Sequence, residues 1–174
     1  LEGIKLIGVM THAGASYRCE SIAAIESMAE QERLAISAAA NHLRAAGYSC
    51  PVVSMGSTPT AQYAQSLEGV TEVRAGVYPF HDLVMAGLGV CQVDDIAISV
   101  LASVIGHQSD RTLLIDAGWM ALSRDRGTAA QAQDQAYGLV CDVEGRVIDD
   151  LLVTATSQEH GQVEDRLGRA IDLD

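Results

Sequence analysis

The chain has 174 residues, of which 48% are apolar, so it is long enough for one domain or two small ones with a packed core. Its 11 basic and 23 acidic residues give a net charge of -12, which argues against nucleic-acid binding, because that requires clustered Lys and Arg. No apolar run reaches the roughly 20 residues of a membrane span. Residues 1–11 resemble a strand more than a signal peptide, so we expect a cytoplasmic protein.

The first 80 residues alternate between strand-like and helix-like segments. We expect strands at Ile4–Met10 (buried on both faces), Pro51–Met55 and Glu72–Arg74, a long helix at Cys19–Ala46 with Ser21 as a possible N-cap, and a short helix at Ala61–Leu67. This alternation predicts a parallel sheet with crossover helices. Three strands cannot close a barrel, since an eight-stranded β/α barrel takes about 250 residues.

After Phe80 the pattern changes to short β-type segments. These are Ile96–Ile105, Leu113–Ile115, and a predicted hairpin in which Tyr137–Cys141 is joined through a turn at Glu144–Gly145 to a strand running from Val147 to Thr156. We therefore expect residues 1–82 to form the α/β part and residues 83–174 a mostly antiparallel β domain. The four cysteines form no CxxC pair, which indicates buried, reduced thiols.

Three loops each follow a predicted strand of the α/β part. Gly56–Thr60 lies between a strand and a helix, so it can be a phosphate site or an ordinary N-cap. Gly76 follows the third strand, where it can let a ligand approach the backbone or can serve as a hinge. In the first loop, Tyr17 is a candidate to contact a ligand, and His12 is either a general base or a packed side chain. Since all three loops end parallel strands, we expect them on one rim.

Two segments of the β part contain possible metal ligands. Asp116 follows one predicted strand, and Glu159-His160-Gly161 follows the strand that we expect to be the last. Either segment can be a simple turn. Neither makes a zinc site alone, because two ligands are too few.

Six ordered motifs give the chain a family resemblance over nearly its whole length. They are THAGASY, VSMGSTPT, EVRAGVYPFHD, IAISVLASVIGH, LIDAGWMALS and SQEHG. In this order they resemble D-serine dehydratase and its relatives, which include D-threo-3-hydroxyaspartate dehydratase and D-threonine aldolase. The resemblance implies the last strands of an alanine-racemase-type (β/α)8 barrel followed by a mostly antiparallel β domain that is incomplete at its end.

The resemblance also implies a cofactor and the residues that hold it. The family binds pyridoxal phosphate on a lysine near the first barrel strand, and a zinc ion held by His and Cys assists loss of the β-hydroxyl. By matching position, Tyr17 looks like a cofactor-contacting tyrosine, Thr58 a phosphate-binding hydroxyl, and Gly76 and Val77 backbone donors to the phosphate. The chain departs from the family pattern at Met10, Ala15, Ala75 and Val77, which stand where Tyr, His, Pro and Asn are common.

No catalytic residue is expected within the chain itself. Lys5 is the only lysine, and it begins a strand instead of standing at the rim. The His and Cys ligands of the zinc ion are expected beyond Asp174. We therefore expect part of a larger enzyme.

The implied activity is that of a D-amino-acid lyase. The expected reaction is dehydration and deamination of D-serine or another D-3-hydroxy amino acid to an α-keto acid and ammonia, in a parent enzyme that is a homodimer. This chain alone is expected to be inactive. Two alternatives stay open: a D-threonine aldolase or amino-acid racemase parent, and a non-catalytic remnant that binds cofactor or partners.

Overall fold

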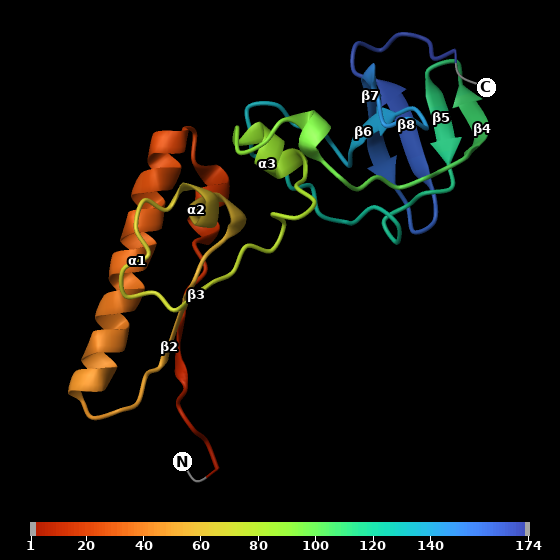
Figure 1. Ribbon diagram of the computed structural model, residues 1–174. Coiled ribbons are helices and arrows are strands. Elements are labelled where there is room, and N and C mark those ends of the chain that lie inside the picture. The colour runs from red at the N-terminus through yellow and green to blue at the C-terminus, as the bar shows by residue number, and fades with distance from the viewer. Residues whose placement is uncertain (1–2, 173–174) are drawn as a thin grey trace. The chain divides into compact units, whose positions relative to one another are not determined.

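The computed structural model describes residues 3–172, and the chain forms two compact units, Leu1–Asp95 and Ile96–Asp174 (Figure 1). The boundary that we expect after residue 82 stays a prediction. None of the helices within residues 3–172 has the length and apolar character needed to cross a bilayer.

A parallel sheet organises the first unit. Its strands, β1 (Gly8–Met10), β2 (Val52–Met55) and β3 (Glu72–Val73), are ordered β1-β2-β3. The first strand is shorter than predicted, and the expectation that both its faces are buried is wrong, because Met10 is 72% exposed. Helix α1 covers one face of the sheet, where Ile36 and Ala40 pack with Val53 and Met55 of β2.

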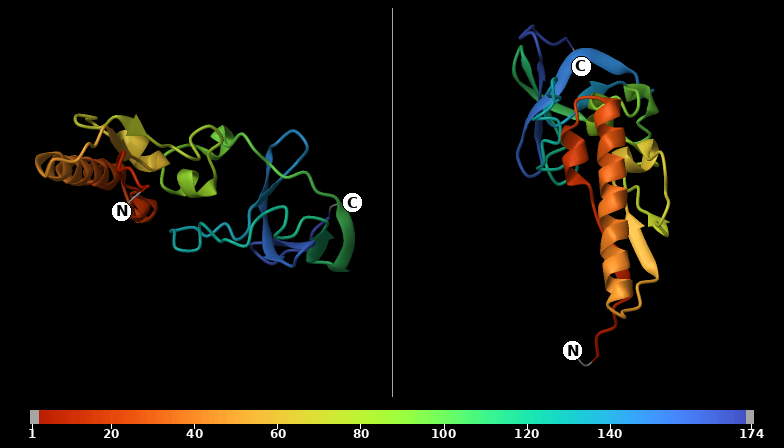
Figure 2. Two further views of the ribbon diagram at one scale, coloured as in Figure 1. Left: turned by 90° about the horizontal axis from the view of Figure 1, so that it is seen from below. Right: turned by 90° about the vertical axis from the view of Figure 1, so that its left-hand side faces the viewer.

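Helix α1 (Ile22–Ala45) lies along the sheet (Figure 2). Ser21 is its N-cap as predicted, and its hydroxyl accepts a hydrogen bond from the Ala24 N–H at 3.2 Å. The cap separates α1 from a 3₁₀ helix, η1 (Gly14–Arg18), so the predicted start at Cys19 is wrong by one turn. The buried stripe of α1 consists of Ile25, Ala29, Glu32, Ile36 and Ala40. Its apolar members follow helical periodicity, and Ile36 and Ala40 pack in one cluster with Val53 and Met55 of β2.

The second helix begins earlier than predicted. Helix α2 spans Thr58–Tyr63, not Ala61–Leu67. Ser57 and Thr60 form a capping box, in which each side chain accepts from the other residue's backbone N–H, and Pro59 lies in the first turn. This local hydrogen bonding fixes the helix start directly after the β2 loop.

A third helix was not predicted. The Asp82 side chain accepts a hydrogen bond from Met85 N–H at 2.8 Å and so caps α3 (Leu83–Gly87), which is followed by the 3₁₀ helix η2 (Val93–Asp95). Met85, Leu88 and Cys91 form a small buried cluster here, which we call the α3 cluster. A five-residue helix is too short to show the periodicity by which helices are recognised.

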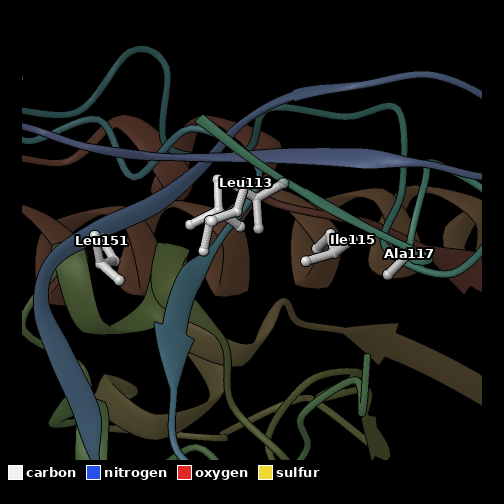
Figure 3. Packing of buried hydrophobic residues seen from close by; sticks show 6 residues of the cluster. Leu113, Ile115, Ala117 and Leu151 are labelled. Carbon is white, nitrogen blue, oxygen red and sulfur yellow. The ribbon is translucent and has the colours of Figure 1, made fainter. Parts of the chain in front are cut away.

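The second unit is a five-stranded antiparallel sheet ordered β4-β5-β8-β7-β6. Its strands are β4 (Val104–Ser109), β5 (Thr112–Ile115), β6 (Leu139–Cys141), β7 (Val147–Thr156) and β8 (Gly161–Asp165). Figure 3 shows the cluster of apolar side chains, including Leu113, Ile115, Ala117 and Leu151, that fills its core. The predicted β6–β7 hairpin is confirmed, with Gly145 at a φ of +84° in its turn.

Two predictions for the second unit are wrong. Residues 96–103 form no strand, although they are rich in β-branched residues, and several of their apolar side chains, such as Leu101, are exposed. Gly161–Asp165 forms a further, central strand, so the strand that ends at Thr156 is not the last one as expected. Gly161 and Val163, two residues apart, are the buried positions of β8, as expected for one face of a strand. The other three residues are Gln, Glu and Asp, and because acidic residues are uncommon in strands, the sequence did not indicate a strand here.

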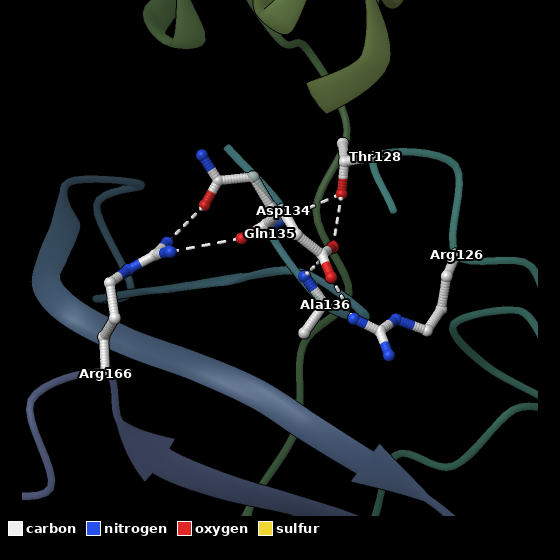
Figure 4. Close-up of polar contacts among 6 residues, drawn as sticks. All are labelled: Arg126, Thr128, Asp134, Gln135, Ala136 and Arg166. Carbon is white, nitrogen blue, oxygen red and sulfur yellow. Dashed lines mark hydrogen bonds and ion pairs between the residues drawn. The ribbon is translucent and has the colours of Figure 1, made fainter. Parts of the chain in front are cut away.

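The long connection between β5 and β6 is held by a polar network (Figure 4). Asp134 accepts hydrogen bonds from Thr128 Oγ1 at 3.1 Å and from Ala136 N–H at 2.9 Å, and it forms an ion pair with Arg126. Arg166 donates to the Asp134 carbonyl, tying the connection to the end of β8. These bonds order a segment that has no regular secondary structure.

Both units agree with the predicted fold class: parallel strands with crossover helices, followed by an antiparallel β unit. The thiols are free; Cys50 and Cys91 are buried as expected, whereas Cys19 and Cys141 are only half-buried.

Candidate functional site

Three loops meet at the carboxyl-terminal edge of the β1-β2-β3 sheet. The β1 loop (residues 11–17), the β2 loop (residues 56–60) and the β3 loop (residues 74–78) each follow a strand of this parallel sheet. Parallel strands end at the same edge, so the topology alone brings these loops together. Hydrogen bonds then fix them: Thr11 N–H donates to the Ser54 carbonyl at 3.0 Å, and Arg74 N–H to the Met55 carbonyl at 2.8 Å.

The β2 and β3 loops are joined by two of the predicted site residues. Val77 N–H donates to Thr58 Oγ1 at 3.1 Å. Thr58 is buried, and its hydroxyl proton stays available for a further acceptor after its oxygen has accepted this bond. Val77 N–H, which we expected to face a ligand, is thus occupied by Thr58 in this structure.

Tyr17 approaches the same place from the β1 loop. Its side chain and that of Val77 both pack against the α3 cluster. Partial burial, and to a smaller extent the negative charge of Asp82, raise the pKa of the Tyr17 phenol above its ordinary value. The phenol therefore stays protonated and can donate a hydrogen bond at neutral pH.

Gly76, in the β3 loop, is exposed beside the place where the three loops contact one another. A methyl group built at Gly76 would have no heavy atom within 4 Å, and among residues 3–172 its N–H has no hydrogen-bond acceptor. Glycine here is thus not required by its neighbours. The backbone N–H and the empty space beside it are open to a ligand.

His12 has a fixed orientation in the β1 loop. Its Nδ1 lies 3.2 Å from the Gly56 carbonyl oxygen, so this nitrogen is the donor, and in the neutral ring Nε2 is then an acceptor. The His12 and Tyr17 ring centroids are 5.8 Å apart. His12 is exposed, so the packed-residue alternative does not describe it, and it is available to a ligand that contacts Tyr17.

Two residues that were not predicted as site residues, Arg74 and Glu32, hold these loops. Arg74 Nε donates to Ser54 Oγ at 2.9 Å, and its guanidinium also donates to the Thr11 carbonyl, which ties the β3 loop to the β1 loop. Glu32, in α1, is buried behind the β1 and β2 loops. Its position on the apolar stripe of α1, between Ala29 and Ile36, is the signal that could have identified it.

The remaining residues considered as catalytic or metal-binding candidates either lie away from the three loops or have structural roles. Lys5 is exposed and precedes β1, so it stands toward the opposite edge of the sheet from the loops. In the second unit, the Asp116 side chain accepts from Ser103 N–H at 2.7 Å, and the His160 carbonyl accepts from Ser157 N–H at 2.8 Å, as expected of turn residues. Residues 3–172 contain no cluster of three or more potential metal ligands.

The comparisons with known proteins agree with this architecture. Residues 1–83 match the family model of the alanine racemase N-terminal domain, and residues 97–172 match that of a serine dehydratase domain. The fold and the rim of loops thus define a part of an alanine-racemase-type protein. Each unit is thus similar to a domain of the D-serine-dehydratase-like proteins of that fold.

Individual relatives make this similarity more specific. D-threo-3-hydroxyaspartate dehydratase from Delftia sp. is 59% identical over 160 residues, covering 91% of this chain and 42% of the relative. D-serine dehydratase from Dictyostelium discoideum is 33% identical over 173 residues, covering 95% of this chain and 43% of the relative. The chain therefore spans less than half the length of the curated relatives it matches.

Solved structures give the same result. The Delftia dehydratase superimposes with a TM-score of 0.89 at 56% identity, over 97% of this chain and 45% of its own. A variant of that enzyme has been solved in a metal-free form. D-threonine aldolase from Filomicrobium marinum has a TM-score of 0.70 at 20% identity, over 95% of this chain and 41% of its own, and so shares the fold.

Proposed function

We propose that the first unit is the phosphate-binding and ring-binding part of a pyridoxal-phosphate site in a D-3-hydroxy-amino-acid dehydratase. One observation carries this proposal: the Thr58–Val77 hydrogen bond and the shared packing of Tyr17 and Val77 bring all three loops to one place. The likeness to two dehydratases supplies the class of reaction.

The donor set suits a phosphate monoester on an aromatic ring. Thr58 offers a hydroxyl proton, Gly76 offers an N–H beside open space, and Tyr17 offers a protonated phenol on an aromatic ring. Phosphate groups are commonly held by such backbone and hydroxyl donors, and a ring can stack or hydrogen-bond beside them. Thr58 and Gly76 would hold the phosphate, with Val77 N–H joining them if Thr58 rotates, and Tyr17 would face the ring.

The cofactor, when bound, supplies a conjugated ring that spreads the negative charge left by removal of the substrate's α-proton. The chain's own contribution is to bind and orient that ring. No lysine stands at the loops, because Lys5 lies toward the other edge of the sheet, so we assign no covalent step to this chain. We propose that the lysine and the metal ligands come from residues outside these 174.

The substrate we propose is a small D-3-hydroxy amino acid, with D-threo-3-hydroxyaspartate ahead of D-serine, because the 59% identical relative is named for the former. Dehydration followed by hydrolysis would release ammonia and an α-keto acid. We also propose a cytoplasmic, homodimeric parent enzyme.

Binding of pyridoxine 5′-phosphate, which lacks the reactive aldehyde, tests the proposal on the purified chain. Thr58→Val should weaken binding at least about tenfold, since a hydrogen bond to a charged group contributes roughly 1.5–3 kcal/mol. Thr58→Ser keeps the hydroxyl and should bind like the unmodified chain. Ser27→Ala, which removes an exposed hydroxyl from α1, is the matched control. Equal binding by all variants would contradict the assigned phosphate site.

Two further observations test the proposal that the lysine and the metal ligands come from outside these 174 residues: the activity of the chain and the coding sequence beside it. The chain with pyridoxal phosphate and zinc should release no ammonia from D-serine or D-threo-3-hydroxyaspartate over many turnovers, and sustained turnover would show that it needs no outside lysine. The coding sequence on either side of the segment should supply a lysine-bearing barrel half and a His/Cys pair. Cofactor binding by a parent protein that has neither would instead support a non-catalytic remnant.

A further inference from the structure

Glu32 is an acidic residue on the otherwise apolar, sheet-facing stripe of α1. It is only 7% exposed. Its carboxylate accepts three hydrogen bonds: from Thr11 Oγ1 at 2.9 Å, from Gly56 N–H at 3.1 Å and from Thr60 Oγ1 at 2.9 Å. Among residues 3–172 it has no ion-pair partner, so these three donors compensate for the cost of burying the carboxylate.

The three donors belong to the two loops that close around the proposed site. Thr11 begins the β1 loop, while Gly56 and Thr60 begin and end the β2 loop. Gly56 has a φ of +122°, and a Cβ there would lie 2.8 Å from the Arg74 carbonyl oxygen. The Gly56 N–H is therefore in a backbone conformation specific to glycine and points at a carboxylate from a distant helix.

The hydrogen bonding continues from Glu32 to the rim. Thr60 Oγ1 lies 3.1 Å from Ser57 Oγ, which lies 2.9 Å from Ser16 Oγ, and Ser16 precedes Tyr17. A carboxylate can only accept, so Thr60 must donate its hydroxyl proton to Glu32. Ser57 then donates to Thr60, and Ser16 donates to Ser57, which orients a chain of buried hydroxyls toward one acceptor.

We propose that Glu32 is a positioning residue that sets the β1 and β2 loops in the geometry required for binding the phosphorylated ring. This inference rests on the proposed function. Glu32 itself does not contact the ligand; it acts through Thr60 and Ser57 on the loop that carries Thr58, and through Ser16 on the loop that carries Tyr17.

Two substitutions break the acceptor pattern without leaving a large cavity. Glu32→Gln places an NH₂ group where either Thr60 or the Thr11–Gly56 pair needs an acceptor, so at least one donor loses its partner. Thr60→Val removes the hydroxyl link while keeping the branched shape, and Thr60→Ser restores it. Glu30→Gln is the matched control, since Glu30 is exposed on the same helix and its ion pair within residues 3–172 is with Arg33.

The experiment measures two quantities on the purified chain. The first is amide hydrogen exchange in residues 11–17 and 56–60 without ligand, and the second is affinity for pyridoxine 5′-phosphate. Glu32→Gln and Thr60→Val should speed exchange in both loops and weaken affinity about tenfold, whereas Glu30→Gln and Thr60→Ser should match the unmodified chain.

The outcomes separate this inference from the function on which it rests. Unchanged loop exchange in Glu32→Gln, or faster exchange with unchanged affinity, would overturn the positioning role. An unmodified chain that does not bind pyridoxine 5′-phosphate would overturn the proposed function. In that case, faster exchange in Glu32→Gln would still confirm that Glu32 orders the loops, and unchanged exchange would reject it.

Discussion

The two units are stabilised in different ways. In the second unit, every strand pairs with its neighbours in an antiparallel sheet over a continuous apolar cluster. In the first unit, three short parallel strands carry loops that are held by buried hydroxyls, one carboxylate and one guanidinium. The second unit thus depends on apolar packing, whereas the rim of the first depends on satisfied polar groups, and substitutions should affect the two differently.

The largest effect is expected in the apolar core of the second unit. Leu113 is 1% exposed, so Leu113→Ala should lower the free energy of unfolding by about 2–5 kcal/mol through lost burial and the cavity left behind. Chemical denaturation followed by circular dichroism measures this loss. Leu167→Ala, at a position that is 66% exposed, serves as the control. Similar losses in both variants would mean that Leu113 is not part of a close-packed core.

Substituting one glycine in each unit compares a structural glycine with one proposed to bind ligand. A Cβ at Gly118 would lie 2.4 Å from the Ser157 carbonyl oxygen, so Gly118→Ala should cost about 1–3 kcal/mol through backbone displacement in the second unit. Gly76→Ala, in open space, should leave the thermal midpoint unchanged and instead reduce affinity for pyridoxine 5′-phosphate. A lower midpoint for Gly76→Ala would show that this glycine has a structural role.

The smallest effect concerns ionisation of Tyr17. Its folded-state pKa is raised above the ordinary value of 10.0, mainly by burial. The associated stability is therefore fully present below about pH 10 and is lost as pH rises through the folded pKa. The ultraviolet difference between the chain and Tyr17→Phe should show a phenol titrating above pH 10. Asp82→Asn should lower that pKa slightly while keeping the α3 cap, and no change would exclude the Asp82 charge as a contributor.

Sequence reasoning succeeded where the signal is local. Helix α1 is long and Ala-rich, its Ser21 cap follows from a known preference, and the β6–β7 hairpin has a Gly145 turn between strand-like runs. The three rim loops were predicted because parallel strands must end at one edge. The ordered motifs indicated Tyr17, Thr58, Gly76 and Val77 in those loops as cofactor contacts, and this assignment stays a prediction.

Prediction failed where neighbours distant in sequence decide the structure. Strand β8 contains acidic residues, and Glu164 is accommodated there because Thr112 and Thr154 on the adjacent strands donate to it. Glu32 stands out by its position on the apolar stripe of α1, but the groups that bind its carboxylate are known only once Thr11, Gly56 and Thr60 are placed against it. Carboxylates such as those of Glu164 and Glu32 are identified by the groups that donate hydrogen bonds to them, and these groups lie on other strands and loops.

The α3 cluster has one further consequence, which concerns thiol chemistry. Cys91 lies in this cluster, and burial, with Asp95 and Asp82 nearby, raises the pKa of its thiol. Alkylating reagents attack the thiolate, so Cys91 should be labelled only when the cluster opens. The rate of its labelling would therefore report how often the packing beneath Tyr17 and Val77 opens, and no substitution is needed to introduce the reporter thiol.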